Sequence, residues 1–198
     1  MKVLVLGLGI SGIKAAEFLK KRGNDVSVFD DNPASIEKIS GLYGIYEPDM
    51  VYDFAVISPG IPSDHPAVIS LINKNIEVIG EMELAGRYIE NEKIIAVTGT
   101  NGKSTTVSIT YEILKEAGYN VLLCGNIGEP VISGVGKGYD FLVIEISSFQ
   151  LETLKSIHPD ISMILNVTPD HLDRYSSYED YLLTKIFLAR LAKPEGLL

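Results

Sequence analysis

Thr98-Gly99-Thr100-Asn101-Gly102-Lys103-Ser104-Thr105 lies between the apolar run Ile94–Val97 and a segment of helical periodicity. A glycine turn between a strand and a helix is typical of a loop that binds phosphate through backbone amides. Val97 stands where the standard phosphate-binding loop has its first glycine. In such a loop Lys103 reaches the terminal phosphates and the Ser104 hydroxyl coordinates Mg²⁺. We therefore predict a site for nucleotide phosphates formed by Gly99, Thr100, Asn101, Gly102, Lys103, Ser104 and Thr105.

A second glycine turn lies near the start of the chain. Gly7-Leu8-Gly9-Ile10-Ser11-Gly12 matches the pattern G-x-G-x-x-G, and it follows the predicted strand Lys2–Leu6. Asp30 and Asp31 come directly after the next predicted strand, where a dinucleotide-binding enzyme places the acid that binds a ribose. The turn therefore predicts a nucleotide diphosphate ligand. The alternative is that these glycines serve only the packing of the helix against the strand.

Short β-branched runs alternate with longer helical segments, which is typical of parallel α/β sheets. The predicted strands are Lys2–Leu6, Asp25–Phe29, Asp53–Ser58, Glu77–Ile79, Lys93–Thr98, Val121–Leu123, Phe141–Ile146 and Ile161–Asn166. The predicted helices are Ser11–Lys21, Lys103–Ala117 and Tyr178–Leu191. We expect an α/β fold with a Rossmann-like parallel-sheet domain over residues 1–91 and a P-loop-type α/β domain over residues 92–198. The chain stops where another strand begins, so the second domain is expected to be incomplete.

Composition narrows the class of protein. The 198 residues include 17 Lys and Arg against 26 Asp and Glu, a net charge of −9. This acidic balance disfavours binding to a nucleic-acid backbone. No apolar stretch approaches the ~20 residues that a membrane span needs. Cys124 is the only cysteine, which excludes an intrachain disulfide and fits a reducing compartment. We expect a cytoplasmic protein that binds neither nucleic acid nor a membrane.

Three further side chains are candidates for chemistry. Glu145 lies at the end of a predicted buried strand, where a metal-binding carboxylate belongs if a phosphate loop is near. His171 lies in the polar run Asn166–Tyr175 and could be a metal ligand or a general base. Lys185 lies in the last predicted helix, and its spacing alone predicts a solvated lysine on an amphipathic surface.

Together these motifs resemble the Mur ligase family, the ATP-dependent enzymes that form amide bonds in peptidoglycan precursor synthesis. The resemblance covers nearly the whole chain and rests on Gly7–Gly12, Ser58-Pro59-Gly60-Ile61, Gly80-Glu81-Met82-Glu83-Leu84, Thr98–Thr105, Gly125-Asn126-Ile127-Gly128, Glu145–Glu152 and Asn166–Tyr175. The first glycine turn, together with Ser148-Phe-Gln-Leu-Glu152, is similar to members of the family that add D-glutamate.

The resemblance implies roles that the residues alone do not. The first domain would bind UDP, with Ile10 and Ser11 near the diphosphate and Asp30 and Asp31 near the uracil. The residues implied to contact the muramoyl substrate are Gly60 and Asn126. Ser104 and Glu145 would hold one Mg²⁺, and His171 a second. Lys185 matches a lysine that CO₂ converts to a carbamate, an anionic oxygen ligand that suits Mg²⁺. Lys103, His171 and Lys185 are thus the implied catalytic residues.

The implied reaction joins UDP-N-acetylmuramoyl-L-alanine to D-glutamate with ATP. The alanyl carboxylate attacks the γ-phosphate to give an acyl phosphate and ADP, and the amine of D-glutamate then displaces phosphate. In the family a third domain brings the D-glutamate site, so we expect this chain alone to be inactive. Two alternatives remain open. One is an NAD-dependent oxidoreductase built on the first glycine turn, and the other is a nucleotide-binding module without chemistry.

Overall fold

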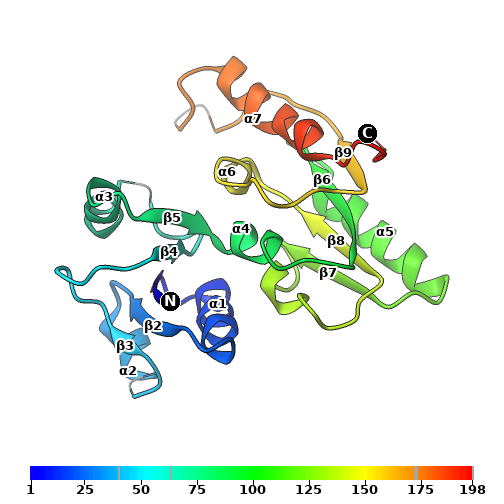
Figure 1. The fold of residues 1–198 in the computed structure, drawn as a ribbon. Coiled ribbons are helices and arrows are strands. Elements are labelled where there is room, and N and C mark those ends of the chain that lie inside the picture. Colours follow the sequence, from blue (N-terminus) through cyan, green and yellow to red (C-terminus); the bar gives the residue numbers. More distant parts are fainter. Residues whose placement is uncertain (40, 63, 172–173, 198) are drawn as a thin grey trace. The chain divides into compact units, whose positions relative to one another are not determined.

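The computed structural model describes residues 1–39, 41–62, 64–171 and 174–197. The chain divides into two compact units, Met1–Leu84 and Ala85–Leu198. Each unit is built on a parallel sheet with helices, so the predicted α/β fold is confirmed (Figure 1). The division falls within helix α4 (Glu81–Gly86), ahead of the boundary expected after Asn91. Within the described part of the chain, no helix is both long enough and apolar enough to span a membrane.

The first unit holds a five-stranded sheet in which every neighbouring pair is parallel. Its strands, in spatial order, are β3 (Gly44–Ile45), β2 (Asp25–Phe29), β1 (Lys2–Leu6), β4 (Phe54–Ile57) and β5 (Glu77–Gly80). Its helices are α1 (Ile10–Lys21), α2 (Pro33–Glu37) and α3 (Pro66–Asn73). The chain builds outward from β1 on one side and then returns to build on the other. Such a reversal leaves a crevice at the carboxyl ends of β1 and β4, where open α/β sheets bind ligands.

The core of the first unit explains the position of this crevice. Val3 to Leu6 are fully buried because helices cover the sheet on both sides. Leu4 and Leu6 belong to one apolar cluster with Val68 and Leu71 of α3. Helix α1 packs against β1, β2 and β4 (Figure 1). The buried strands therefore hold the turn after β1 and the loop after β4 side by side.

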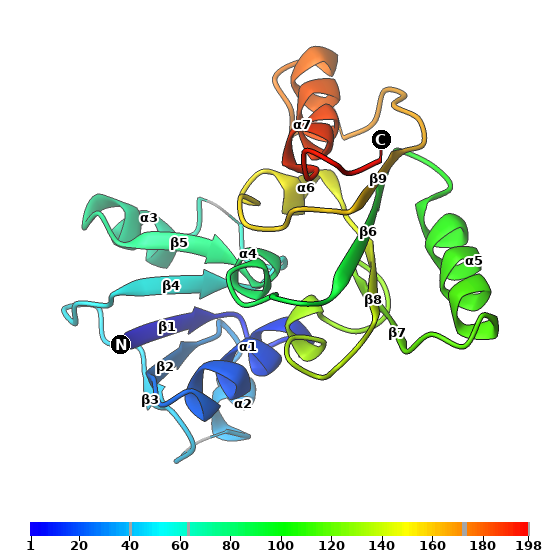
Figure 2. The same ribbon diagram turned by 45° about the vertical axis from the view of Figure 1, so that its right-hand side comes forward.

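The second unit holds a four-stranded parallel sheet. Its strands, in spatial order, are β7 (Val121–Gly125), β8 (Phe141–Glu145), β6 (Lys93–Thr98) and β9 (Ile161–Ile164). Its remaining helices are α5 (Lys103–Glu116), the 3₁₀ turn η1 (Val131–Ser133), α6 (Ser148–Leu151) and α7 (Tyr178–Leu191). Helix α5 packs against β6, β7 and β8, as Figure 2 shows. Helices α6 and α7 pack together, and α7 lies against β9 (Figure 1).

The order of these strands brings the predicted site residues to one edge. β6 lies between β8 and β9, so the segments that follow these three strands meet at the carboxyl end of the sheet. Glu145 is the last residue of β8, and the segments after β6 and β9 carry the Gly99 turn and Asn166. Val97, which replaces the glycine of a standard loop, is a fully buried residue of β6 that packs with Val107 of α5. The turn therefore begins at Gly99, and the valine anchors its strand.

The structure also contains short elements that the sequence did not predict. β3 has two residues, both exposed, and so offers no apolar pattern. Helices α2, α4 and α6 are too short for a helical period to show. Helix α3 begins at Pro66, and its first turn is capped because His65 Nδ1 accepts a hydrogen bond from the Ala67 amide (3.2 Å). A proline at the first helical position is a start signal, so this helix was predictable from sequence.

Candidate active site

The glycines of the β1–α1 turn are required by close packing. Gly7 has a φ of +85°, which disfavours any other residue. A Cβ on Gly12 would lie 1.8 Å from the carbonyl oxygen of Gly7, so α1 approaches the turn at that point too closely for a side chain. Ser58, directly after β4, donates its hydroxyl to the same carbonyl at 2.8 Å. The packing role of these glycines is thus real, and it places the first helical amides beside the loop after β4.

A pocket of ≈ 440 Å³ opens at this turn. Its lining residues are Gly7, Gly9, Ile10, Ser11, Asp30, Ser58, Pro59, Gly60 and Ile61. The structure therefore brings together four predicted substrate residues, Ile10, Ser11, Asp30 and Gly60. The α1 N-terminus in this pocket can attract an anion through its free amides.

The two predicted acids of the first unit lie in different surroundings. Asp30 accepts hydrogen bonds from the amides of Leu8 (2.6 Å) and Asn32 (2.9 Å), so its carboxylate ties the glycine turn to the end of β2. Asp31 is mostly exposed and pairs with His65, whose Nε2 lies 3.2 Å from Asp31 Oδ1. Asp30 lines the pocket and Asp31 is not among its lining residues.

The β6–α5 turn is held by the segment after β9. The amide of Thr100 donates to the carbonyl of Asn166 (3.0 Å), and the amide of Asn101 donates to Asn166 Oδ1 (3.0 Å). Asn166 Nδ2 donates back to the carbonyl of Asn101 (3.0 Å). Gly102 then turns the chain into α5 with a φ of +84°. These bonds fix a loop whose amides precede a helix N-terminus, as a phosphate site needs.

Two lysines converge on one carbonyl of this loop. Lys103 Nζ donates to the carbonyl oxygens of Gly99 (2.9 Å) and Thr100 (3.0 Å), and Lys185 Nζ also donates to that of Gly99 (2.9 Å). Burial, and secondarily the charge of Lys103, lower the pKa of Lys185 to about 8, although Asp170 opposes this shift. The turn is therefore a locus of positive charge, which suits a polyanion.

The prediction of a solvated Lys185, drawn from spacing alone, is wrong. The residue is only 2% exposed. The buried face of α7 runs through Tyr181, Lys185 and Leu188, at helical spacing, and this face packs toward the sheet. Lys185 is buried because it lies on the same face of α7 as Tyr181 and Leu188, which pack into the core.

Glu145 combines burial with an incomplete set of hydrogen bonds. Its side chain is 1% exposed, and its Oε1 accepts a hydrogen bond from Asn126 Nδ2 at 2.8 Å. Its Oε2 is buried and has no hydrogen-bond partner among the described residues. A carboxylate oxygen in this position is costly unless a cation lies nearby. The donor set therefore fits Mg²⁺, which prefers oxygen ligands. Ser104, the other predicted ligand, lies exposed in the first turn of α5.

His171 is exposed in the segment that follows β9. Its backbone has a φ of +52°, and its Nε2 lies 3.6 Å from Asp170 Oδ2. Its ring lies 4.9 Å from that of Phe149 and 6.3 Å from that of Tyr181. Across the described ranges, no three His, Cys, Asp or Glu side chains gather into one metal cluster. Two residues of the polar run, Leu172 and Asp173, fall outside those ranges.

Four residues that hydrogen-bond to the two turns were not predicted as site residues from the sequence. They are Ser58, Asn166, Thr168 and Tyr181. Asn166 and Thr168 belong to the polar run Asn166–Tyr175, so the sequence did indicate a functional segment there. Tyr181 gave no signal, because a tyrosine in an amphipathic helix is expected in the core.

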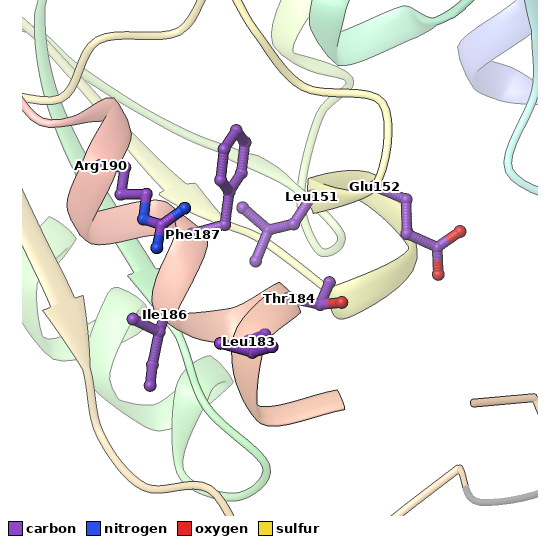
Figure 3. A pocket seen from close by; sticks show the side chains of 7 residues that line it. All are labelled: Leu151, Glu152, Leu183, Thr184, Ile186, Phe187 and Arg190. Atoms are coloured by element: carbon purple, nitrogen blue, oxygen red, sulfur yellow. The ribbon is translucent and has the colours of Figure 1, made fainter. Parts of the chain in front are cut away.

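A second pocket of ≈ 390 Å³ lies between α6 and α7. It is lined by Leu151, Glu152, Leu183, Thr184, Ile186, Phe187 and Arg190. Figure 3 shows Leu151 and Phe187 side by side, with the Glu152 carboxylate directed away from them. Glu152 is bound by Arg174 (2.8 Å) and Tyr175 (2.7 Å). None of the predicted site residues lines this pocket.

Comparison with known families gives two matches. The model described as "Mur ligase middle domain" matches residues 97–198. The model described as "Mur ligase MurD-like, N-terminal domain" matches residues 1–80. Together they cover both glycine turns.

Similar curated proteins carry one name. A UDP-N-acetylmuramoylalanine–D-glutamate ligase of Caldicellulosiruptor saccharolyticus is 44% identical over 98% of this chain and 46% of its own length. A protein of the same name from Acidobacterium capsulatum is 45% identical over 96% of this chain and 44% of its own length. The chain thus spans about half the length of the curated relatives it matches.

Two solved structures share the fold. The UDP-N-acetylmuramate:L-alanyl-gamma-D-glutamyl-meso-diaminopimelate ligase of Neisseria meningitides has a TM-score of 0.63 at 21% identity, covering 98% of this chain and 69% of that chain. The UDP-N-acetylmuramate-alanine ligase of Thermotoga maritima has a TM-score of 0.56 at 21% identity, covering 97% and 47%. At this identity the likeness concerns the fold alone.

Proposed function

Because the chain belongs to the Mur ligase family, we propose that it forms the substrate-binding and ATP-binding parts of an ATP-dependent amide ligase. The proposed reaction adds D-glutamate to UDP-N-acetylmuramoyl-L-alanine in peptidoglycan precursor synthesis, as the names of the relatives suggest. The observation that carries the proposal is the pair of lysines on the Gly99 carbonyl at the same sheet edge as the unpaired oxygen of Glu145. The Lys103 ammonium suits the phosphates of ATP, and the Glu145 carboxylate suits their magnesium ion.

We assign the two ligands to different domains. Residues 1–91 would bind the UDP part of the substrate, and residues 92–198 would bind ATP. In the first domain, Ile10, Ser11 and Gly60 line the pocket where the diphosphate would meet the α1 N-terminus. Asp30 and Asp31 would accept hydrogen bonds from the uracil.

In the second domain, the loop from Gly99 through Thr100, Asn101, Gly102 and Ser104 to Thr105 would bind ATP. The amides of Thr100 and Asn101 donate to Asn166 and fix the loop, so the phosphates would be bound by the amides that follow, at the start of α5. Lys103 would neutralise the transferring phosphate, because its ammonium is already held at the loop. Asn126 would contact the muramoyl substrate while its amide orients Glu145. The loops would thereby align the alanyl carboxylate with the γ-phosphate.

Ser104 and Glu145 would hold one magnesium ion, and His171 a second. When bound, Mg²⁺ supplies charge neutralisation on the phosphate oxygens. Lys185 would react as a neutral amine with CO₂, giving a carbamate and releasing one proton, which converts a cation into an anionic ligand. Its lowered pKa supports this role, since a larger share of the amine is neutral near pH 8 than for an ordinary lysine.

The chemistry needs an activated carboxylate because direct condensation with an amine in water is unfavourable. The alanyl carboxylate would attack the γ-phosphate, releasing ADP and forming an acyl phosphate. The amine of D-glutamate would then attack the acyl carbon, so that phosphate and a proton leave. A cytoplasmic location, with neither nucleic acid nor a membrane as partner, completes the proposal.

Calorimetric titration of this chain with UDP-N-acetylmuramoyl-L-alanine tests the substrate site, with NADH as the control ligand. Ser11→Trp should abolish saturable binding because the indole fills the pocket. Ser70→Trp makes the same change on α3, away from the pocket lining, and should leave binding unchanged. Binding of NADH in place of the UDP substrate would contradict the proposal and favour an oxidoreductase.

A second titration with ATP and Mg²⁺ tests the other domain. We expect binding that Lys103→Met weakens at least ten-fold, and no turnover of D-glutamate by this chain alone. Turnover at an ordinary rate would contradict the expected need for a further domain. Absence of ATP binding with the UDP substrate still bound would favour a binding module without chemistry.

A further inference from the structure

The side chain of Tyr181 contacts three proposed site residues: Thr100, His171 and Lys185. It is 1% exposed and lies one helical turn before Lys185 on α7. Its hydroxyl lies 3.0 Å from Thr100 Oγ1, and its ring centroid lies 4.9 Å from Lys185 Nζ. The side chain therefore links α7 to the loop that follows β6.

The hydrogen bonds of Thr100 determine which hydroxyl donates. Thr100 Oγ1 lies 3.2 Å from the carbonyl of Thr168, which can only accept, so the single threonine proton goes there. The amide of Thr168 donates to the same Oγ1 at 3.1 Å. Thr100 Oγ1 has a second lone pair left, so the Tyr181 hydroxyl must be the donor in the 3.0 Å contact. The Thr100 hydroxyl thus donates to the Thr168 carbonyl and accepts from the Thr168 amide and the Tyr181 hydroxyl.

We propose that Tyr181 is a positioning residue whose hydroxyl proton locks the Thr100 side chain, and through it the phosphate loop, in the conformation that receives ATP. The inference rests on the proposed ATP site. The Thr100 side chain also bonds to Thr168, which follows β9. The loop after β6 is therefore held both by α7, through Tyr181, and by the segment after β9. The Lys185 ammonium lies over the same tyrosine ring and donates to the Gly99 carbonyl, so the ring also lies beside the lysine that contacts the loop.

Packing alone does not explain a tyrosine here. A phenylalanine would fill the same volume and avoid burying a hydroxyl, which is costly unless it is hydrogen-bonded. The buried hydroxyl is accommodated here because Thr100 Oγ1 accepts its proton.

The test compares Tyr181→Phe with Tyr178→Phe. Both changes remove one hydrogen-bonded hydroxyl from the same helix, and the hydroxyl of Tyr178, which is half-buried, donates to the Val167 carbonyl (2.9 Å) rather than to the loop. Two quantities are measured on the full 198-residue chain: the three-bond couplings of Thr100, which report its χ1 rotamer by NMR, and the Kd for ATP with Mg²⁺. Thermal unfolding of both variants shows that they remain folded.

We expect the Thr100 couplings to become rotamer-averaged in Tyr181→Phe and the Kd for ATP to rise about ten-fold, or about 1.4 kcal/mol. Tyr178→Phe should leave both unchanged at a similar loss of stability. Unchanged Thr100 couplings in Tyr181→Phe would overturn the inference, whether or not ATP binds. If the parent chain does not bind ATP, the proposed function fails, and the couplings still decide the role of the hydroxyl.

Discussion

The turn after β1 and the turn after β6 both lead from a central parallel strand through glycines into a helix, yet opposite charges hold them. In the first turn, the Asp30 carboxylate accepts the Leu8 amide. In the second, the ammonium groups of Lys103 and Lys185 both donate to the Gly99 carbonyl. In the first turn a backbone amide donates to a carboxylate, and in the second a backbone carbonyl accepts hydrogen bonds from two ammonium groups.

The difference shows that a glycine pattern predicts backbone shape and leaves the ligand's charge open. A turn with an acid in its wall suits a ligand that offers hydrogen-bond donors beside its phosphates, as a nucleoside diphosphate does. A turn with two lysines suits a ligand of higher negative charge, as ATP has. The predictions below separate what backbone packing contributes in each turn from what the charged groups contribute.

The largest effect is expected for Gly12→Ala in the first turn. The added Cβ would meet the Gly7 carbonyl oxygen at 1.8 Å, and backbone atoms cannot swing aside. We expect a loss of about 3 kcal/mol in the free energy of unfolding, measured by urea denaturation. Gly9→Ala is the matched control in the same turn, because nothing lies within 4 Å of its added Cβ, and it should cost less than about 1 kcal/mol. Equal losses of stability in the two variants would show that packing does not require a glycine at position 12.

The second turn should respond to pH through Lys185. Its pKa of about 8 lies below the ordinary 10.5, so between these values the unfolded chain binds more protons than the folded chain. The free energy of unfolding should therefore rise with pH across that window by about 3 kcal/mol, and this group should give no rise below about pH 8. Lys185→Met should abolish this part of the slope in carbonate-free buffer without magnesium.

Lys103→Met sharpens the same measurement. Removing the like charge beside Lys185 should move its pKa upward and shift the start of the rise to higher pH. If Lys185→Met leaves the slope of the parent chain intact, the buried lysine is not the group that titrates.

The sequence predicted those strands correctly whose burial requires apolar residues along nearly their whole length. β1, β6 and β8 are nearly continuous apolar runs, so their existence and edges were predictable to within a residue or two. It failed for β3, whose two residues are exposed and whose place depends on pairing with β2. The sequence of two exposed residues does not indicate which strand they pair with.

The candidate site divides in the same way. The loop and Glu145 could be predicted as neighbours because strand ends in a parallel sheet meet at one edge, which is a rule about topology. Lys185 was misjudged from spacing because a helix face is assigned by counting apolar residues, and a lysine subtracts from that count. Tyr181 was missed because its contact with Thr100 joins residues 81 positions apart, and no periodicity reports it.

The smallest effect concerns the hydroxyl that steadies the first turn. Ser58→Ala removes the 2.8 Å hydrogen bond to the Gly7 carbonyl and leaves that buried oxygen with one donor fewer. We expect a loss of about 1 kcal/mol in the free energy of unfolding and a weaker UDP-substrate titration, with ATP binding unchanged. Asn166→Ala is its counterpart in the second turn, since it removes two side-chain bonds to Asn101, and it should weaken ATP binding while sparing the UDP substrate. If each variant weakened both ligands equally, the two turns would not be separate sites, and the assignment of one ligand to each would fail.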